Sequence, residues 1–188
     1  DFELRRRFAE SPTKRPLTKE DWHEFYDTII EWLNTDCTFA GVRRGNLPPV
    51  GKNTMDNTET LQATFYNGNK LPNINELIWN HDLVSEDVNL HLQLLIRGHR
   101  NRVWCKYGSV SKWAQKGGCQ SGINPRTVKM INESHERLIE LYPNFVKWNM
   151  QNGKQKIAGL SFNKGYKAIK VFYSNAYKSS RIKTLNFE

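Results

Sequence analysis

Residues 108–143, GSVSKWAQKGGCQSGINPRTVKMINESHERLIELYP, carry the pattern on which the predicted fold depends. Ser109 is suited to cap a first helix, and the first glycine pair of the stretch is suited to end it. The Asn-Pro pair at 124–125 is typical of the start of a second helix, which we expect to continue to about Tyr142. The stretch therefore predicts two helices joined by a short connection.

The segment GINPRTVKMI, residues 122–131, resembles the start of the recognition helix in helix-turn-helix DNA-binding proteins. In that family, polar and basic side chains at the beginning of this helix contact base edges and phosphates. The resemblance implies that DNA is contacted by Asn124, Arg126, Thr127 and Lys129. The connection GGCQSG is longer than the turn of the standard motif, so an ordinary helical hairpin is the alternative interpretation.

Residues 154–174, KQKIAGLSFNKGYKAIKVFYS, predict a β-hairpin. Apolar residues alternate in its second half, and the sequence Asn-Lys-Gly at 163–165 is a turn signal. We expect residues 144–153, just before it, to extend the helical region. By analogy with winged-helix proteins, this basic hairpin would be a wing that places Lys164 and Lys167 against the DNA backbone, whereas an ordinary surface hairpin is the alternative.

Charge is distributed unevenly along the chain. Residues 1–87 contain 15 acidic and 10 basic residues, for a net charge of −5, and residues 88–188 contain 4 acidic and 18 basic residues, for +14. A surface that is merely kept soluble by charge normally mixes both signs, so this segregation favours a polyanionic ligand, of which phosphates are the usual kind. The candidate nucleic-acid-binding residues are Arg97, Arg100, Arg102, Lys106, Lys112, Asn124, Arg126, Thr127, Lys129, Lys164, Lys167 and Lys170.

The N-terminal half begins with a basic segment, residues 1–16, which we expect to be an arm. A helix follows, because Thr18 with Asp21 fits a capping-box variant and apolar residues recur at helical spacing. The apolar residues expected to face the core are Trp22, Phe25, Tyr26, Ile29, Ile30 and Leu33.

Further elements are predicted between this helix and the basic half. Residues 38–54 indicate a strand or an extended connection followed by a loop, and a second strand is expected to end at the Asn-Gly turn at 67–68, before a short helix. Ser85 is suited to cap a helix that stops at Gly98. We expect Trp104, which follows among basic residues, to lie in the core.

Together these patterns predict a single α+β domain over residues 17–188, preceded by the arm. Its body is expected to be mainly helical, with the helix-turn-helix-like segment and a basic C-terminal β-hairpin. Because of this hairpin, a winged-helix-like arrangement is one alternative. An acidic half, residues 17–87, precedes a basic half, residues 88–188, which we expect to face nucleic acid.

Motifs for metal binding and catalysis are absent from the sequence. Cys37, Cys105 and Cys119 cannot all pair within the chain, and no Cys-x-x-Cys or His-x-x-x-His spacing indicates zinc. No carboxylate cluster of a metal-dependent nuclease, phosphate-binding glycine motif or nucleophile elbow is present. We therefore expect no metal and no cofactor, and the sequence favours a binding module over an enzyme without excluding catalytic groups that converge from distant positions. Because no apolar run is long enough to cross a bilayer, we expect an intracellular protein without a membrane partner, nuclear in a eukaryote.

The sequence thus predicts a DNA-binding module that reads duplex DNA with the helix starting near Pro125 and contacts phosphates with the surrounding Lys and Arg. One alternative is an RNA-binding or nucleocapsid-type protein, in which unpaired bases would stack on Trp104, Tyr107, Trp148 and Tyr166. The other is a protein-interaction domain that docks an acidic partner. The acidic N-terminal half is in addition a candidate surface for a protein partner.

Overall fold

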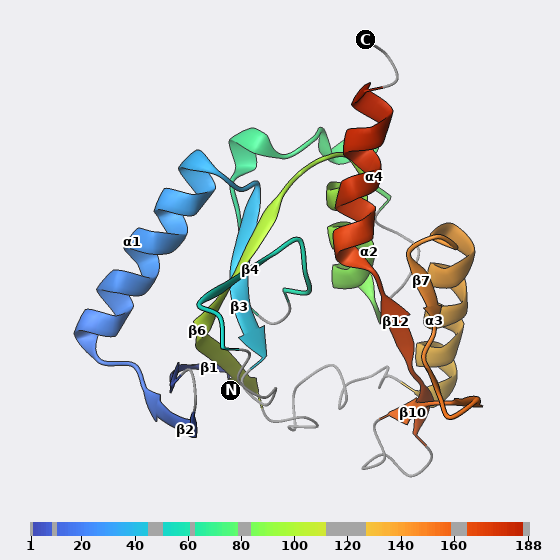
Figure 1. Ribbon diagram of the computed structural model, residues 1–188, viewed down its shortest axis with the longest axis horizontal. Coiled ribbons are helices and arrows are strands. Elements are labelled where there is room, and N and C mark those ends of the chain that lie inside the picture. Colours follow the sequence, from blue (N-terminus) through green and yellow to red (C-terminus); the bar gives the residue numbers. More distant parts are fainter. Residues whose placement is uncertain are drawn as a thin grey trace.

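The computed structural model describes residues 2–8, 11–44, 51–60, 63–78, 84–111, 127–158 and 165–185. They form an α+β fold, as predicted, in which a mixed sheet with helix α1 lies on one side and a smaller group of short strands with helix α3 lies on the other (Figure 1). Helices α2 and α4 lie between the two parts. The main layer is a sheet, whereas the sequence predicted a mainly helical body.

Six of the described strands form the main sheet, in the order β2-β1-β6-β3-β5, with β4 paired to the first part of β6. Its strands are β1 (Phe2–Phe8), β2 (Ser11–Pro16), β3 (Phe39–Arg44), β4 (Thr54–Asp56), β5 (Thr64–Tyr66) and β6 (Asn101–Ser111). Strands β3 and β6 are parallel, and the other pairs are antiparallel. The segment expected to be a basic arm therefore supplies two strands of the sheet.

Strand β6 occupies residues that were expected to begin the first helix of the helix-turn-helix segment. Ser109 lies opposite Leu4 in the β1–β6 pair, so the prediction that Ser109 caps a helix is wrong. Valine and aromatic residues, which favour strands, recur along β6, and partner strands on both sides satisfy its backbone. The rest of that expected helix and its connection, residues 112–126, lie outside the described residues.

Helix α1 (Lys19–Thr35) begins where the sequence predicted. Thr18 is its N-cap, and the capping box is complete, because Thr18 Oγ1 accepts from Asp21 N at 3.3 Å and Asp21 Oδ2 accepts from Thr18 N at 2.9 Å. Phe25 and Ile29 are buried against the sheet, as expected. The prediction is wrong for three of the six apolar residues, since the helix contacts the sheet on one side only and leaves exposed Trp22, Tyr26 and Ile30.

Two clusters of buried side chains hold the fold together. The first lies between α1 and the sheet and includes Phe25, Val42, Trp104 and Tyr107. Trp104 is thus in the core, as predicted. Tyr107 is fully buried and donates its hydroxyl to Glu24 Oε2 at 2.8 Å, so neither ring is available to stack on a base, contrary to the RNA-binding alternative.

The second cluster joins helices α2 and α4 to strand β3 and to the C-terminal part of the chain. It includes Phe39 of β3, Leu92 of α2 (Glu86–Ile96), Leu138 of α3 (Val128–Leu141) and Ala176 of α4 (Tyr173–Leu185). Helix α2 follows Ser85 and ends before Gly98, as predicted, although the Ser85 side chain makes no capping hydrogen bond. The short helix predicted after Pro72 is present as one 3-10 turn, η2 (Ile74–Glu76), and a further 3-10 turn, η1 (Gly68–Lys70), precedes it.

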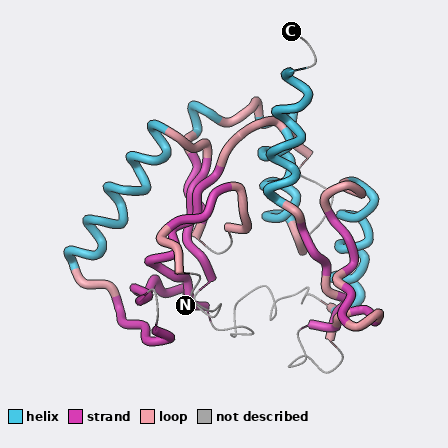
Figure 2. Tube along the Cα trace, viewed as in Figure 1, coloured by secondary structure: helices cyan, strands magenta, loops and turns pink. Residues whose placement is uncertain are grey.

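The remaining strands, with α3, form what we call the C-terminal unit, shown by the short strands in Figure 2. They are β7 (Val146–Trp148), β8 (Met150–Gln151), β9 (Lys154–Gln155), β10 (Ile157–Ala158), β11 (Tyr166–Lys167) and β12 (Ile169–Val171). Backbone hydrogen bonds of 2.8 Å among Asn149, Lys156 and Ala168 join these strands into one group of three segments, 146–151, 154–158 and 166–171. Each segment pairs with the other two, and we call the group the meander.

This meander corrects two predictions. Residues 144–153 are not helical: β8 and β9 form a hairpin around Asn152 and Gly153, whose φ angles of 52° and 72° suit the two-residue turn that Asn-Gly favours. The predicted C-terminal hairpin is present where β10 pairs with β11, but β12 pairs with β7 and Tyr173 begins a helix. In the part of the chain that the structure describes, no helix combines the length and apolarity needed to cross a membrane.

Candidate nucleic-acid interface

The candidate residues from the sequence lie on several elements of the fold. Lys112, Asn124, Arg126 and Lys164 lie outside the described residues. The other eight are distributed over the main sheet, helix α2, the start of α3 and the meander.

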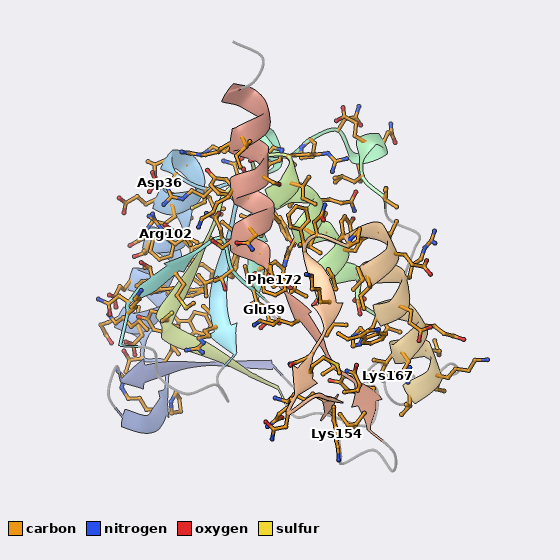
Figure 3. The ribbon with its side chains drawn as sticks, turned by 45° about the vertical axis from the view of Figure 1, so that its right-hand side comes forward. Asp36, Glu59, Arg102, Lys154, Lys167 and Phe172 are labelled. Atoms are coloured by element: carbon orange, nitrogen blue, oxygen red, sulfur yellow. The ribbon has the colours of Figure 1, made fainter. Side chains whose placement is uncertain are left out.

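Three candidates on and next to β6 are neutralised by carboxylates of the acidic half. Arg102 donates from Nη1 to Asp36 and from Nε to Asp56, each at 2.8 Å, and Arg100 pairs with Asp56 as well (Figure 3). Lys106 pairs with Glu24. Partial burial acts to raise the pKa of Asp56, but hydrogen bonds from the two arginines lower it below its ordinary value. Part of the charge segregation in the sequence is thus balanced within the folded chain.

Arg97 also has internal partners. It donates from Nη1 to the carbonyl oxygen of Gln93 at 3.1 Å and from Nη2 to that of Glu76 at 2.9 Å. These bonds satisfy carbonyls at the end of α2 and in η2, a role that a basic side chain commonly takes at a helix C-terminus. Its guanidinium therefore has a structural role in the described fold.

The start of α3 differs from the prediction. Thr127, not Asn124, is the N-cap, and its Oγ1 accepts from Met130 N at 3.1 Å, so this oxygen already has a partner. Lys129, in the first turn, is highly exposed, with Glu133 at 3.7 Å. The helix continues to Leu141, close to the expected end.

The meander carries exposed lysines on all three of its segments. In the antiparallel β7–β12 pair, Lys147 lies directly opposite Lys170. Gln151 lies in the next strand, β8, which pairs with β9. Lys154 is opposite Gln151 in that pair, and Lys156 follows two residues later. We call this group of Lys147, Lys154, Lys156 and Lys170 the lysine face.

The lysine face has no ion-pair partner in the described part of the chain. All four lysines are exposed, and among the residues that the structure describes none of them has a carboxylate within ion-pair distance. Lys170 Nζ lies 5.1 Å from the centre of the Phe172 ring. The sequence candidates included only Lys170 of this group. The signal that was missed is the Asn-Gly turn, which converts the region expected to be helical into strands with period-two alternation.

The opposite side of the meander is different in character. Val146, Ile169 and Val171 pack into the second core cluster, and Lys167 Nζ lies 5.3 Å from the Trp148 ring and 3.5 Å from Glu136. Lys167 thus has partners of its own, and it faces away from the other meander lysines.

No group of three or more His, Cys, Asp or Glu side chains suited to a metal ion is present in the described ranges. Burial raises the pKa of the Cys37 thiol to about 11. Comparison of the chain with family models, curated proteins and solved structures gives no significant match.

Proposed function

We propose that this chain binds nucleic acid through the phosphate backbone, with the lysine face as the contact surface. The observation that carries the proposal is the opposed pair Lys147 and Lys170. Like charges directly opposite each other in a sheet destabilise it, and phosphate neutralises them. Lys154 and Lys156 extend the same charge along the meander.

The side chains between these lysines favour duplex DNA over unpaired bases. Asn149, Gln151 and Ala168 lie among the lysines. The nearby Trp148 belongs to the opposite face, beneath Lys167, and the ring of Phe172 is already occupied by the ammonium group of Lys170. Proteins that bind single strands usually stack bases on aromatic rings. A face of lysines and amides contacts phosphates without stacking, so we expect a weak sequence preference from this surface.

A second candidate is readout of bases by the start of α3. Lys129 is exposed in the first helical turn, and Asn132 of the next turn accepts from the backbone N of Lys167 at 2.8 Å, which fixes the start of α3 beside β11. A helix N-terminus favours negative charge, so the start of α3 offers a separate contact for phosphate.

Fluorescence anisotropy with duplex DNA, single-stranded DNA and RNA of equal length, across a salt series, tests the proposal. The Lys147→Ala, Lys170→Ala variant is compared with a control of equal charge loss, Lys19→Ala, Lys52→Ala, both exposed and far from the meander in sequence. Each phosphate contact contributes about −0.9 to the slope of log affinity against log salt for duplex DNA. The lysine-face variant should therefore flatten the slope by about 1.8, and the control should leave it unchanged.

Equal losses in the two variants would show that only net charge matters and would overturn the assignment to the lysine face. Absence of binding to every polymer at low salt would overturn the function itself. Lys129→Ala separates the second candidate, because loss of base readout changes the ranking of duplex sequences, whereas loss of a lysine-face contact weakens all duplexes alike.

A further inference from the structure

Helix α1 presents an apolar stripe to solvent. Trp22, Tyr26 and Ile30 follow one another at intervals of four residues, and 37%, 48% and 53% of their surfaces are exposed. The rings of Trp22 and Tyr26 stack with centres 5.6 Å apart. Phe25 and Ile29 make the contact with the sheet, so the stripe lies beside that contact. Contiguous exposed apolar side chains of this size commonly mark an interaction site.

Negative charges border this stripe. Glu20, Asp27 and Glu31 are exposed on the side of α1 away from the sheet, and no described residue forms an ion pair with them. When a partner covers the stripe, the border of the partner's own surface lies within reach of these carboxylates. The surface therefore fits a partner with apolar side chains bordered by Lys or Arg.

The same chain carries a surface of that kind at the tip of the meander. Met150 and Ile157 are 56% and 43% exposed. Lys154 and Lys156 flank them in sequence, and Figure 3 places Lys154 and Lys167 at the same end of the C-terminal unit. Helix α1 and the C-terminal unit lie on opposite sides of the molecule (Figure 1), so the two surfaces of one chain do not meet each other.

We infer that the chain associates with further copies of itself head to tail, with the α1 stripe of one copy against the meander tip of the next. The opposite charges of the two surfaces and their exposed apolar side chains select a second copy as the partner. Because the contact joins two different surfaces, a chain of copies always has a free α1 stripe at one end and a free meander tip at the other. The assembly therefore grows beyond a dimer unless it closes into a ring. By strand alternation, Met150 and Ile157 face away from the lysine face, but the contact shares Lys154 and Lys156 with the surface proposed for nucleic acid, which is why association is tested without nucleic acid.

Sedimentation velocity of the full chain over a dilution series, without nucleic acid, tests this inference. The average mass of the wild type should rise with concentration past that of a dimer, and less steeply at high salt, which screens the charges. Trp22→Ala, Tyr26→Ala and, separately, Met150→Ala, Ile157→Ala should each weaken association at least tenfold. The control is Ile182→Ala on α4, which removes a side chain with 61% exposure outside both surfaces and should change nothing.

Mixing the two double variants gives the sharper result. The α1 variant retains an intact tip and the tip variant retains an intact stripe, so the mixture should form a one-to-one dimer and nothing larger. If circular dichroism shows that the α1 variant has lost helix, Asp27→Lys, Glu31→Lys replaces it, since both carboxylates face water.

A wild type that stays monomeric at all concentrations would overturn the inference and assign the stripe to another protein. A wild-type dimer that grows no further, with no dimer in the mixture, would show a symmetric contact and overturn the head-to-tail arrangement. DNA binding by dilute protein is measured separately, so failure of self-association leaves the proposed function untouched.

Discussion

One substitution at the opposed lysines of the meander should raise the stability of the fold and lower its affinity for DNA. Lys147 and Lys170 are direct partners in the β7–β12 pair, where Cβ atoms lie about 4.5–5.5 Å apart. The substitution Lys147→Glu converts this pair of like charges into a pair of opposite charges. It also preserves the contact of Lys170 with the Phe172 ring, which the reciprocal substitution would remove.

The expected gain in stability follows from the geometry. Opposite charges at directly opposed positions contribute roughly 0.2–1 kcal/mol, and like charges are unfavourable by a similar amount. Exposed pairs lie at the lower end of this range, because water screens them. Lys147→Glu should therefore raise the free energy of unfolding by about 0.5–1 kcal/mol, which corresponds to an increase in Tm of about 1–4 °C for a chain of this size. DNA affinity should fall, because one phosphate contact is replaced by a repulsion.

Urea unfolding at low salt and in 1 M salt, together with anisotropy on duplex DNA, measures both effects. Lys147→Gln serves as the control that removes repulsion without adding attraction, so its stability should lie between those of the wild type and Lys147→Glu. The differences should shrink in 1 M salt, where the screening length is about 3 Å. If Lys147→Glu lowers stability at low salt while DNA binding is unchanged, the two ammonium groups do not act on each other or on DNA, and the reasoning is refuted.

Three further predictions concern the fold. Burial lowers the pKa of His91 to about 4, so the unfolded chain takes up a proton at this residue first, and the free energy of unfolding should decrease as pH falls from about 6.5 towards 4. His91→Phe should make this pH dependence shallower in urea titrations. Part of it should remain, because burial also lowers the pKa values of His99 and His135. Gly41→Ala would place a Cβ 2.6 Å from a backbone carbonyl oxygen, so thermal unfolding should show destabilisation by roughly 1–3 kcal/mol, and an unchanged Tm would contradict the close approach. Gly153→Ala should cost about 1 kcal/mol, because the φ of 72° at this turn suits glycine, and amide exchange should show faster opening of the β8–β9 hairpin than of the main sheet.

Elements defined by neighbouring residues could be predicted from the sequence. The capping box at Thr18 and Asp21 joins residues three positions apart, and the helix that follows Ser85 ends before a glycine with positive φ. Such signals depend on a few neighbouring side chains, so they can be interpreted correctly without knowledge of the rest of the chain. The Asn-Gly turn at 152–153 is a signal of the same kind, and the helix predicted for residues 144–153 overlooked it and with it most of the lysine face.

Other features depend on contacts between distant residues. Arg102 pairs with Asp36 and Asp56, which are 66 and 46 positions away in the chain. These ion pairs neutralise positive charges within the fold, whereas the charge distribution of the sequence had predicted that an external polyanion neutralises them. Ser109 lies in a strand because β1, from the other end of the chain, pairs with it.

The sequence by itself determined the α+β class, the helices that follow Thr18 and Ser85, and the excess of positive charge in the second half, because these follow from composition and from interactions between near neighbours. Only the tertiary structure decided which charges remain uncompensated and which apolar side chains remain exposed. Pairing of β7 with β12 places Lys147 opposite Lys170, and the one-sided contact of α1 with the sheet leaves Trp22 in solvent. Both outcomes depend on strand register and helix orientation, which are set by packing between segments far apart in the chain.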